Sequence, residues 1–503
     1  MRIAFLNPQG NFDIKDSYWT EHPDFGGQLV YVKELANALR NKGHEVDIFT
    51  RMIIDPQWPE FEAKEEVYPD TGVRIIRIPF GGDVFLRKEL LWPFLIEYVE
   101  GIIRFFYSTN DWPDFITTHY GDGGIAGVML NEITDIPFSF TAHSLGAQKM
   151  DKVGMTESKF DELIRYYSFA TRIHAERLAM KEASVRFVST SQEKTKQYQH
   201  GLYSDLFEKD IKKFIVAPPG VNQSYFYYKK ELSEKLNKIR SRDLSKHRRN
   251  LPFIISSSRL DPKKNVSGLI MAFASNAKLQ ERANLLIAVR GTENPYNDFS
   301  ELKEEEQLEM KKILDMIQRY HLGGKVAFIQ LFSQKELASC YRALASDGGV
   351  FCLTSLYEPF GLATIEAMAC GLPVVVTSNG GGREILKEGL ESFGVLVDPE
   401  SSTQISENLL DLVKDSEKWS YFHKQGLKRV AERFTWQSTA NTYEEVIANI
   451  LIDKKEINEV EKQNKANDKK IDLTHYQSWL QHPKKEMENF IKSYYVDRKE
   501  GDG

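Results

Sequence analysis

Two carboxylates flank a glycine turn in the segment EPFGLATIE, residues 358–366. A carboxylate can accept two hydrogen bonds from a vicinal diol, so Glu366 suits a ribose and Glu358 suits sugar hydroxyls. The backbone N–H groups of Phe360, Gly361 and Leu362 can reach a phosphate or a sugar. The neighbouring sequence AMACGLPVVV is apolar, and a buried carboxylate needs a partner. The spacing favours a hydroxyl-rich ligand, with two exposed carboxylates as the alternative.

Two basic side chains in another segment could bind a diphosphate. Arg259 and Lys264 lie in the segment RLDPKKN, between a predicted strand and a predicted helix whose dipole would add to their charge. A solvated basic turn has the same composition and stays open as an alternative. Gly26 and Gly27 precede another predicted helix and would let main-chain N–H groups approach an anion or a hydroxyl-rich ligand. A tight entry into that helix is the alternative.

Two further motifs match known patterns only formally. The segment AHSLG, with Ser144 as the attacking group, resembles the nucleophile elbow of serine hydrolases. A serine hydrolase would need a later histidine at a strand end of the same domain. Residues 145–226 offer only His174 and His200, neither at a predicted strand end, so His143 and Ser144 are expected to contact a ligand instead. The segment GDGGIA resembles a dinucleotide fingerprint but does not follow the first strand, which argues against a nicotinamide cofactor.

Short apolar runs alternate with amphipathic stretches along the first half of the chain, which predicts a parallel α/β sheet. The predicted strands cover residues 2–6, 44–50, 73–79, 114–119, 136–142, 185–190 and 214–218, and the predicted helices cover 29–40, 90–107 and 125–132. Residues 227–250 are highly charged and poor in aliphatic side chains, so a link between domains is expected there.

The same rhythm resumes after the link. Strands are predicted at 251–257, 284–290, 325–331, 349–354, 373–377 and 394–397, and helices at 266–274, 301–320, 335–345, 362–370 and across most of 402–450. We therefore predict two doubly wound, Rossmann-like α/β domains facing across a cleft. They would comprise residues 1–247 and 248–450, and residues 451–503 would form a charged linker and a C-terminal helix that returns to the first domain.

The 503 residues carry a formal net charge of −6 and are 41% hydrophobic, as in an ordinary globular protein. This charge gives no support for nucleic-acid or anionic-membrane binding, and no apolar run approaches the length of a membrane span. Cys340, Cys352 and Cys370 form no C-x-x-C pair, so we expect a reducing cytoplasm. The histidines lack metal-ligand spacing and no Asp-x-Asp occurs, so we expect neither a bound metal nor a cofactor.

These motifs, in this order, resemble retaining GT-B glycosyltransferases, specifically the sucrose-phosphate synthase group of family 4. The resemblance extends to about residue 450, and its anchors include LNPQGNFD, IPFGG, TTHYGDGG, TAHSLGAQK, PPGVN, SSSRLDPKKN, EPFGLATIEA and NGGGREI. It implies a second domain that binds a nucleotide sugar, with no protein nucleophile and no metal. The leaving diphosphate would take the acceptor proton, and catalysis would be positioning and charge stabilisation.

The resemblance also assigns roles to individual residues. The donor-binding residues would be Gly26, Gly27, Arg259, Lys264, Glu358, Phe360, Gly361, Leu362 and Glu366. The acceptor-binding residues would be Gly27, Gln28, Lys88, Tyr120, Ser144, Lys149 and Arg172, whose cations would grip the phosphate of fructose 6-phosphate. The groups closest to the chemistry would be His143, Arg259, Lys264 and Glu358.

The expected reaction transfers glucose from UDP-glucose to fructose 6-phosphate, giving sucrose 6-phosphate and UDP. A mannosylfructose-phosphate synthase using GDP-mannose, a sucrose synthase and an ADP-glucose donor stay open, and a serine hydrolase using Ser144 or a non-catalytic sugar-phosphate sensor are rivals from other classes. Gly382 and Arg383 in NGGGREI replace the Pro-containing NGGP turn that is more usual in the family, which adds a charge near the nucleotide pocket and leaves the donor open. A separate sucrose-phosphate phosphatase would be a partner, because no phosphatase-like domain follows residue 450.

Overall fold

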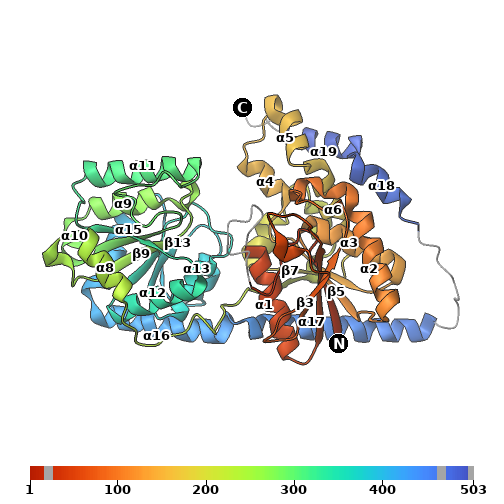
Figure 1. Ribbon diagram of the computed structural model, residues 1–503, viewed down its shortest axis with the longest axis horizontal. Coiled ribbons are helices and arrows are strands. Elements are labelled where there is room, and N and C mark those ends of the chain that lie inside the picture. Colours follow the sequence, from red (N-terminus) through yellow and green to blue (C-terminus); the bar gives the residue numbers. More distant parts are fainter. Residues whose placement is uncertain (16–26, 462–471, 497–503) are drawn as a thin grey trace. The chain divides into compact units, whose positions relative to one another are not determined.

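The computed structural model describes residues 1–15, 27–461 and 472–496, and it divides into two compact units (Figure 1). Unit 1 comprises Met1–Ala217 and Thr439–Gly503, and unit 2 comprises Pro218–Ser438. The chain therefore passes twice between the units, the second time within helix α17 (Trp436–Glu461).

Unit 1 is built on an eight-stranded sheet with the strand order β3-β4-β2-β1-β5-β6-β7-β8. Its strands are β1 (Arg2–Leu6), β2 (Glu45–Arg51), β3 (Glu65–Val67), β4 (Arg74–Ile78), β5 (Phe115–His119), β6 (Phe138–Thr141), β7 (Val185–Val188) and β8 (Phe214–Val216). All neighbours pair in parallel except β3, a short antiparallel edge strand. This is the doubly wound sheet that alternating strands and helices predict.

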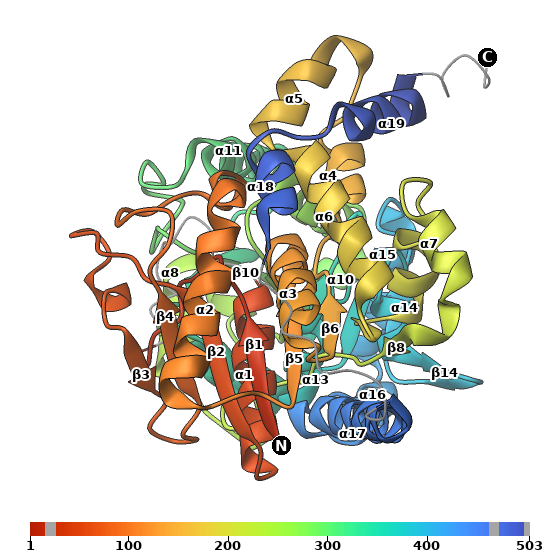
Figure 2. The same cartoon turned by 90° about the vertical axis from the view of Figure 1, so that its right-hand side faces the viewer.

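Most helices of unit 1 connect its strands, and two further helices form a pair near the C-terminus. They are α1 (Gly27–Asn41), α2 (Leu95–Thr109), α3 (Tyr120–Thr134), α4 (Gly146–Lys152), α5 (Phe160–Tyr166), α6 (Phe169–Glu182), α7 (Ser204–Lys209), α18 (Thr474–Gln481) and α19 (Lys485–Val496), together with most of α17. Figure 2 shows α18 and α19 on the outside of this helix layer, near α6.

Side chains of successive strand residues point to opposite faces of the sheet. Ala4 and Leu6 of β1 join one large core with α2, α3 and α6. On the other face, Tyr443 of α17 stacks on Phe187 of β7, with ring centroids 3.6 Å apart, and its hydroxyl lies 3.2 Å from that of Tyr31 in α1. Both faces of the sheet are therefore covered by helices.

Unit 2 has a fully parallel six-stranded sheet with the order β11-β10-β9-β12-β13-β16. Its strands are β9 (Phe253–Ser257), β10 (Asn284–Val289), β11 (Val326–Gln330), β12 (Val350–Leu353), β13 (Val374–Thr377) and β16 (Val395–Val397), beside the hairpin β14 (Lys387–Glu388) and β15 (Glu391–Ser392). Its helices are α8 (Glu234–Asp243), α9 (Val266–Ala274), α10 (Ala277–Arg282), α11 (Glu304–Arg319), α12 (Gln334–Ser346), α13 (Leu362–Ala369), α14 (Gly382–Leu386), α15 (Ser402–Lys414) and α16 (Ser416–Arg433).

The segment predicted as a link belongs to unit 2. Helix α8 begins at a Ser233 cap, whose hydroxyl accepts the Leu236 N–H, and it buries Leu236 and Ile239 in the unit 2 core. The predicted boundaries at 247 and 450 therefore differ from the crossings at 217 and 438 in the structure. The composition of this segment is mostly charged, but the two apolar residues, one helical turn apart, are enough to pack the helix against unit 2. The prediction considered the composition and missed this spacing.

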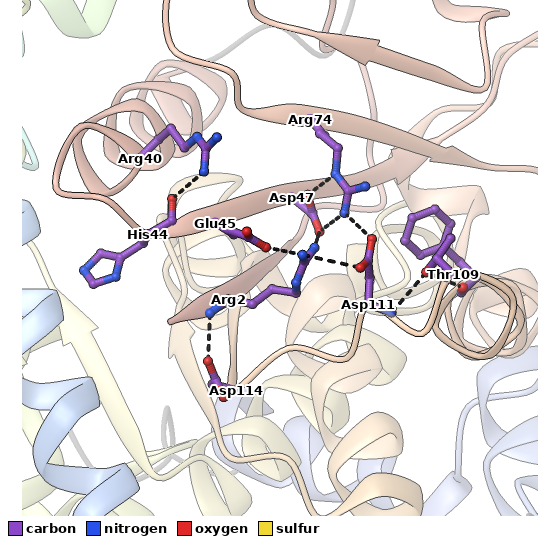
Figure 3. A network of polar contacts seen from close by, with 10 residues as sticks. Arg2, Arg40, His44, Glu45, Asp47, Arg74, Thr109, Asp111 and Asp114 are labelled. Atoms are coloured by element: carbon purple, nitrogen blue, oxygen red, sulfur yellow. Dashed lines mark hydrogen bonds and ion pairs between the residues drawn. The ribbon is translucent and has the colours of Figure 1, made fainter.

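The strands β1, β2 and β4 begin at a dense ion-pair network (Figure 3). Asp47 is nearly buried, and Arg74 binds it through Nε at 2.6 Å and Nη2 at 2.7 Å, while Arg2 Nη1 lies 3.3 Å from it. Arg74 also reaches Asp111 at 3.0 Å. These charges satisfy one another at the amino-terminal edge, which leaves the carboxyl edge for ligands.

Candidate functional site

The carboxyl ends of β5 and β6 bring two histidines together in unit 1. His119 ends β5, His143 follows β6, and Nδ1 of His119 lies 2.9 Å from Nε2 of His143. His119 also stacks on Phe5, with centroids 5.4 Å apart, and the edge of Tyr31 meets His143 at 5.0 Å. Burial lowers the pKa of His143 to about 3 and the pKa of His119 well below its ordinary value. Both rings are therefore neutral near pH 7.

Arg172 of α6 is locked beside Ser144. Its Nε donates to Glu176 Oε1 at 2.8 Å and its Nη2 donates to the Ser144 carbonyl at 2.7 Å. Its guanidinium also covers the Tyr120 ring at 4.3 Å. Glu176 is fully buried and accepts the Gly146 N–H at 3.0 Å and the Tyr203 hydroxyl. The Glu176 carboxylate thus fixes the direction of Arg172 and the start of α4.

Two lysines share one carboxylate nearby. Lys149 Nζ donates to Glu89 Oε1 at 3.2 Å and lies 4.1 Å from the Tyr167 ring centroid. Lys88 Nζ lies 5.9 Å from the Tyr120 ring, on the side chain that Arg172 also contacts. Burial raises the pKa of Glu89, but its backbone N–H, Lys149 and Lys88 outweigh that effect and hold the pKa below its ordinary value. Burial and the like charges of Arg172 and Lys88 act to lower the pKa of Lys149, so the three cations lie near one another, two of them at the Tyr120 ring.

The start of α1 carries the remaining predicted residues of this unit. Gln28 Nε2 donates to Asn7 Oδ1 at 3.3 Å, which ties α1 to the loop after β1. Gly27 is the exposed first residue of α1, whereas Gly26 lies outside the described residues.

Asp122, in the first turn of α3, was not predicted as a site residue. Its Oδ1 accepts the Gly123 N–H at 2.7 Å, while its Oδ2 and Nδ2 of Asn7 are buried polar atoms without a hydrogen-bond partner among the described residues. Burial raises the pKa of Asp122 to about 7, against the lowering effects of Gly123, Gln9 and the cations Lys88 and Arg172. The sequence does contain a signal for this residue, an acidic side chain within the glycine-rich segment GDGGIA. The sequence analysis compared that segment only with the dinucleotide fingerprint.

In unit 2, one ion pair joins the two predicted strand-end loops. Lys264 Nζ donates to Glu358 Oε2 at 2.6 Å, and the same oxygen accepts the Ser355 hydroxyl at 3.2 Å. The Leu356 N–H donates to the Lys263 carbonyl at 2.9 Å, so the main chains of the two loops are also joined. Arg259 is exposed and lies beside Arg290, whose pKa is lowered by burial and by the like charge of Arg259. Arg290, which follows β10, was missed from sequence.

Glycines support the Glu358 loop by close main-chain packing. Glu358 N donates to Asn379 O at 3.0 Å, and Gly381 N donates back to Glu358 O at 2.9 Å. A Cβ at Gly380 would overlap the Glu358 carbonyl oxygen, and one at Gly381 would lie 2.6 Å from the Phe360 carbonyl oxygen. The GGG sequence, interpreted as another glycine loop at a helix start, thus makes room for the backbone of residues 358–360.

The residues after Glu358 differ in burial, from Phe360 in the core to Glu366, which is partly exposed. Phe360 packs in the unit 2 core against Phe434, with centroids 5.9 Å apart, so its main chain is what remains for a ligand. Gly361, with φ +104°, is the N-cap residue of α13, and Leu362 is the first residue of the helix. Glu366 is partly exposed on α13, and burial raises its pKa to about 7. Arg259, Lys264 and Glu358 thus lie in the segments that follow β9 and β12 of one sheet, and Glu366 lies in α13, the helix that follows the Glu358 loop.

The structure also tests a serine hydrolase site, a metal site and a membrane-spanning helix. Nε2 of His143 faces His119, and the Ser144 hydroxyl lies 3.5 Å from Nη2 of Arg172, so His143 is not arranged as a base for Ser144. Within residues 1–15, 27–461 and 472–496, no group of three His, Cys, Asp or Glu side chains suits a metal ion. No helix in that part of the chain is long and apolar enough to cross a bilayer.

Two family models match the chain. The one described as "Glycosyl transferase 4-like domain" matches residues 26–205, and "Glycosyl transferases group 1" matches residues 237–429. A probable sucrose-phosphate synthase of Thermosipho melanesiensis is 48% identical over 444 residues, covering 88% of this chain and 95% of its own. The sucrose-phosphate synthase of Spinacia oleracea is 30% identical and covers 84% of this chain, which spans only 45% of the spinach protein.

Solved structures are similar over most of the chain. A sucrose-phosphate synthase from Thermosynechococcus elongatus matches with a TM-score of 0.64 at 24% identity, covering 90% of this chain and 99% of that one. Anabaena HepE in complex with UDP matches with a TM-score of 0.60 at 16% identity, covering 89% and 100%. At these identities the likeness concerns the fold.

Proposed function

This chain belongs to the sucrose-phosphate synthase family of GT-B glycosyltransferases, and we propose that it transfers glucose from UDP-glucose to fructose 6-phosphate. It is a hexosyltransferase with the two doubly wound α/β domains that the sequence predicted. The products would be sucrose 6-phosphate and UDP. The residue roles below extend this assignment to the chemistry of individual side chains.

The assignment of the acceptor rests on three neighbouring cations of unit 1, two of which lie at the Tyr120 ring. Lys88 and Arg172 both contact the Tyr120 ring, and Lys149 shares Glu89 with Lys88. A phosphate needs such charge-assisted hydrogen bonds, whereas free fructose does not. We therefore assign Lys88, Lys149 and Arg172 to the acceptor phosphate, and Gln28, Tyr120 and Ser144 to its polar contacts, with Gly27 beside them.

The donor is assigned to the strand-end loops of unit 2. Arg259 and Lys264 would hold the diphosphate, and Glu366 the ribose. The main chain at Phe360, Gly361 and Leu362 would face the phosphates or the sugar. Glu358 is supported by Lys264 and by the glycine packing, which suits a fixed acceptor of hydrogen bonds from glucose hydroxyls. Gly26 and Gly27 would complete the phosphate contacts.

The transfer itself needs charge stabilisation more than acid–base chemistry. The bond between glucose C1 and the UDP oxygen breaks, the anomeric hydroxyl oxygen of fructose 6-phosphate bonds to C1 on the same face, and its proton passes to the leaving diphosphate. Arg259 and Lys264 would stabilise the negative charge that develops there. A neutral His143 carries one N–H and one lone pair, so it would contact the donor sugar through hydrogen bonds rather than charge. We expect no metal requirement.

A donor and acceptor panel, scored by released nucleoside diphosphate, tests this function. UDP-glucose with fructose 6-phosphate should release UDP and form a phosphorylated disaccharide, and UDP-glucose with free fructose should react far more slowly. ADP-glucose and GDP-mannose are the competing donors. Mannose transfer without glucose transfer would overturn the donor, and equal use of free fructose would indicate a sucrose synthase.

The compartment and the partner are parts of the same proposal. Cys340, Cys352 and Cys370 are free and buried, which supports a reducing compartment such as the cytoplasm. A separate phosphatase acting on sucrose 6-phosphate would then release sucrose.

A further inference from the structure

The C-terminal helices of unit 1 attach to it through aromatic side chains. Tyr476 and Trp479 of α18 and Ile491 of α19 are buried in the core that α2, α3 and α6 share. Trp479 packs against His174 of α6, with ring centroids 4.4 Å apart. The two helices are therefore an integral layer of unit 1.

One residue of this layer reaches the helix that carries Lys149. The Tyr495 hydroxyl lies 2.6 Å from Oδ1 of Asp151 and 3.2 Å from the carbonyl oxygen of Ala147, both in α4. Since a hydroxyl has one proton, it donates to one of these acceptors at a time. Tyr495 thus lies within hydrogen-bonding distance of both the first turn and the last turn of α4.

The contact is braced from a second side. Asp151 Oδ2 lies 3.4 Å from Nε2 of His200, whose ring packs on Tyr494 at 4.7 Å. Tyr494 packs so closely on Gly201 that a Cβ there would overlap its ring. Burial raises the pKa of Asp151, but the hydrogen bonds from His200 and Tyr495 outweigh it and hold the pKa below its ordinary value. The carboxylate is therefore charged and held between α19 and the chain after β7.

Helix α4 needs such support because it has only seven residues. An isolated helix of that length is not stable in water. Its first N–H groups are held by Glu176 and by the Tyr203 hydroxyl, at Gly146 and Ala147. Tyr495 restrains the same helix through the Ala147 carbonyl and, in the last turn, through Asp151. Because Lys149 lies between these two residues, its position depends on the contacts at both ends of α4.

We propose that Tyr495 is a positioning residue of the acceptor half of the site: it holds α4 so that Lys149 faces the acceptor phosphate. The C-terminal helix thereby sets the affinity for the phosphorylated sugar without touching it. The identity of the acceptor rests on the proposed function, whereas the restraint on α4 does not.

The same tail offers a matched control. Tyr476 in α18 donates to Glu132 Oε2 at 2.6 Å, near the end of α3 and away from α4. Tyr476→Phe and Tyr495→Phe therefore each remove one short hydrogen bond of the tail. A tail that only stabilises unit 1 would respond equally to both, whereas a positioning role predicts an effect of Tyr495→Phe alone.

The kinetic test compares the two variants in the full chain. Tyr495→Phe should raise the KM for fructose 6-phosphate about three- to tenfold, the size of one lost hydrogen bond, and leave kcat and the KM for UDP-glucose within about twofold. Asp151→Ala should repeat the effect, and Asp151→Asn, which keeps an oxygen acceptor, should restore part of it. Equal KM values in Tyr495→Phe and Tyr476→Phe, or a parallel change in both substrates, would overturn the proposal.

A second measurement does not depend on activity. Amide hydrogen exchange of residues 146–152 should accelerate in Tyr495→Phe and stay unchanged in Tyr476→Phe. Unchanged exchange in both variants would overturn the restraint itself. If the wild-type protein fails to use fructose 6-phosphate, the proposed function falls, and the exchange contrast still decides whether Tyr495 holds α4.

Discussion

In unit 1 the candidate residues are joined side chain to side chain, whereas in unit 2 they are joined largely main chain to main chain. Arg172, Glu176 and Tyr203 form a buried polar chain that reaches the carbonyl of the exposed Ser144, with Lys149 held by Glu89 beside it. In unit 2, the Lys264–Glu358 pair lies on loops connected by main-chain hydrogen bonds at residues 356, 358 and 381.

The difference decides which substitutions each half tolerates. A side-chain network fails when a charge is removed, even if the shape of the side chain is kept, because the partner remains buried without compensation. A main-chain framework fails when a Cβ is added where two backbones touch, even if no charge changes. Isosteric charge removal should therefore be most severe in unit 1, and glycine-to-alanine substitution in unit 2.

The largest effect is expected from Glu176→Gln in unit 1. The substitution keeps the shape but leaves the Arg172 guanidinium buried without a counter-charge, which should destabilise the unit by about 3–5 kcal/mol. Thermal unfolding measures this. Asp205→Asn is the control, since Asp205 pairs at 2.7 Å with Arg177 on the same helix but is about half exposed, and such pairs contribute under ~1 kcal/mol. Equal shifts in both variants would contradict the comparison.

Gly380→Ala should be the most damaging small change in unit 2. Gly380 has φ +113°, and its new Cβ would displace the Glu358 carbonyl and with it the donor contacts. A misplacement of that kind lowers kcat/KM for UDP-glucose by about 10²-fold. Gly389→Ala is the control, because Gly389 has φ +56° with nothing within 4 Å, so it adds backbone strain without a clash. Comparable activity loss in both would refute the packing argument.

Lys264→Ala tests whether the ion pair serves the donor as well as the loop. We expect a loss of about 10²-fold in kcat, because the lysine would stabilise the leaving diphosphate. Lys263→Ala, an exposed neighbour in the same turn, should keep wild-type kcat. A Lys264→Ala enzyme that loses donor affinity but keeps its kcat would limit Lys264 to supporting Glu358.

The smallest effect is a pH dependence that the halves share. Burial raises the pKa of Asp122 in unit 1 and of Glu366 in unit 2 to about 7, from ordinary values of 3.8 and 4.5. The folded state therefore favours the protonated forms, and this contribution is lost as pH rises from about 4.5 to 7. Asp122→Asn and Glu366→Gln should each raise the unfolding midpoint, relative to wild type, more at pH 8 than at pH 5. A difference independent of pH would show that the folded-state pKa of the carboxyl is not raised into the range between pH 5 and pH 8, and would contradict the prediction.

Much of this fold was predictable because its strands are short apolar runs and its helices have amphipathic spacing. The predicted strand 284–290 is β10 (Asn284–Val289), and the predicted helix 266–274 is α9. The predicted helix 90–107 instead begins as α2 at Leu95, because Pro93 lies in the short helix η4 (Trp92–Phe94) that precedes it. Arg172 was predicted to lie in a helix, which is α6, but no bounds were predicted for α4 to α6, because their buried faces are set by tertiary contacts rather than by a regular apolar pattern.

The candidate site was less predictable than the fold. Motifs at strand ends identify Lys264 and Glu358 separately, but only the structure joins them at 2.6 Å. Arg172 was predicted to bind the acceptor phosphate, and the structure adds that Glu176 and the Ser144 carbonyl already accept hydrogen bonds from its guanidinium. An arginine and a glutamate four residues apart look the same on a solvated helix face, so sequence spacing alone cannot identify a buried pair.

The two crossings between the units also set an order for synthesis on the ribosome. Unit 2 is continuous in sequence and can complete its core as soon as residues 218–438 have emerged, whereas unit 1 must wait for residues after 438. Until then Tyr443 is missing, and with it the ring that stacks on Phe187 and the hydroxyl that lies 3.0 Å from Thr141 Oγ1. The half of the enzyme that begins first is therefore finished last, and nascent chains released early would expose one face of the unit 1 sheet.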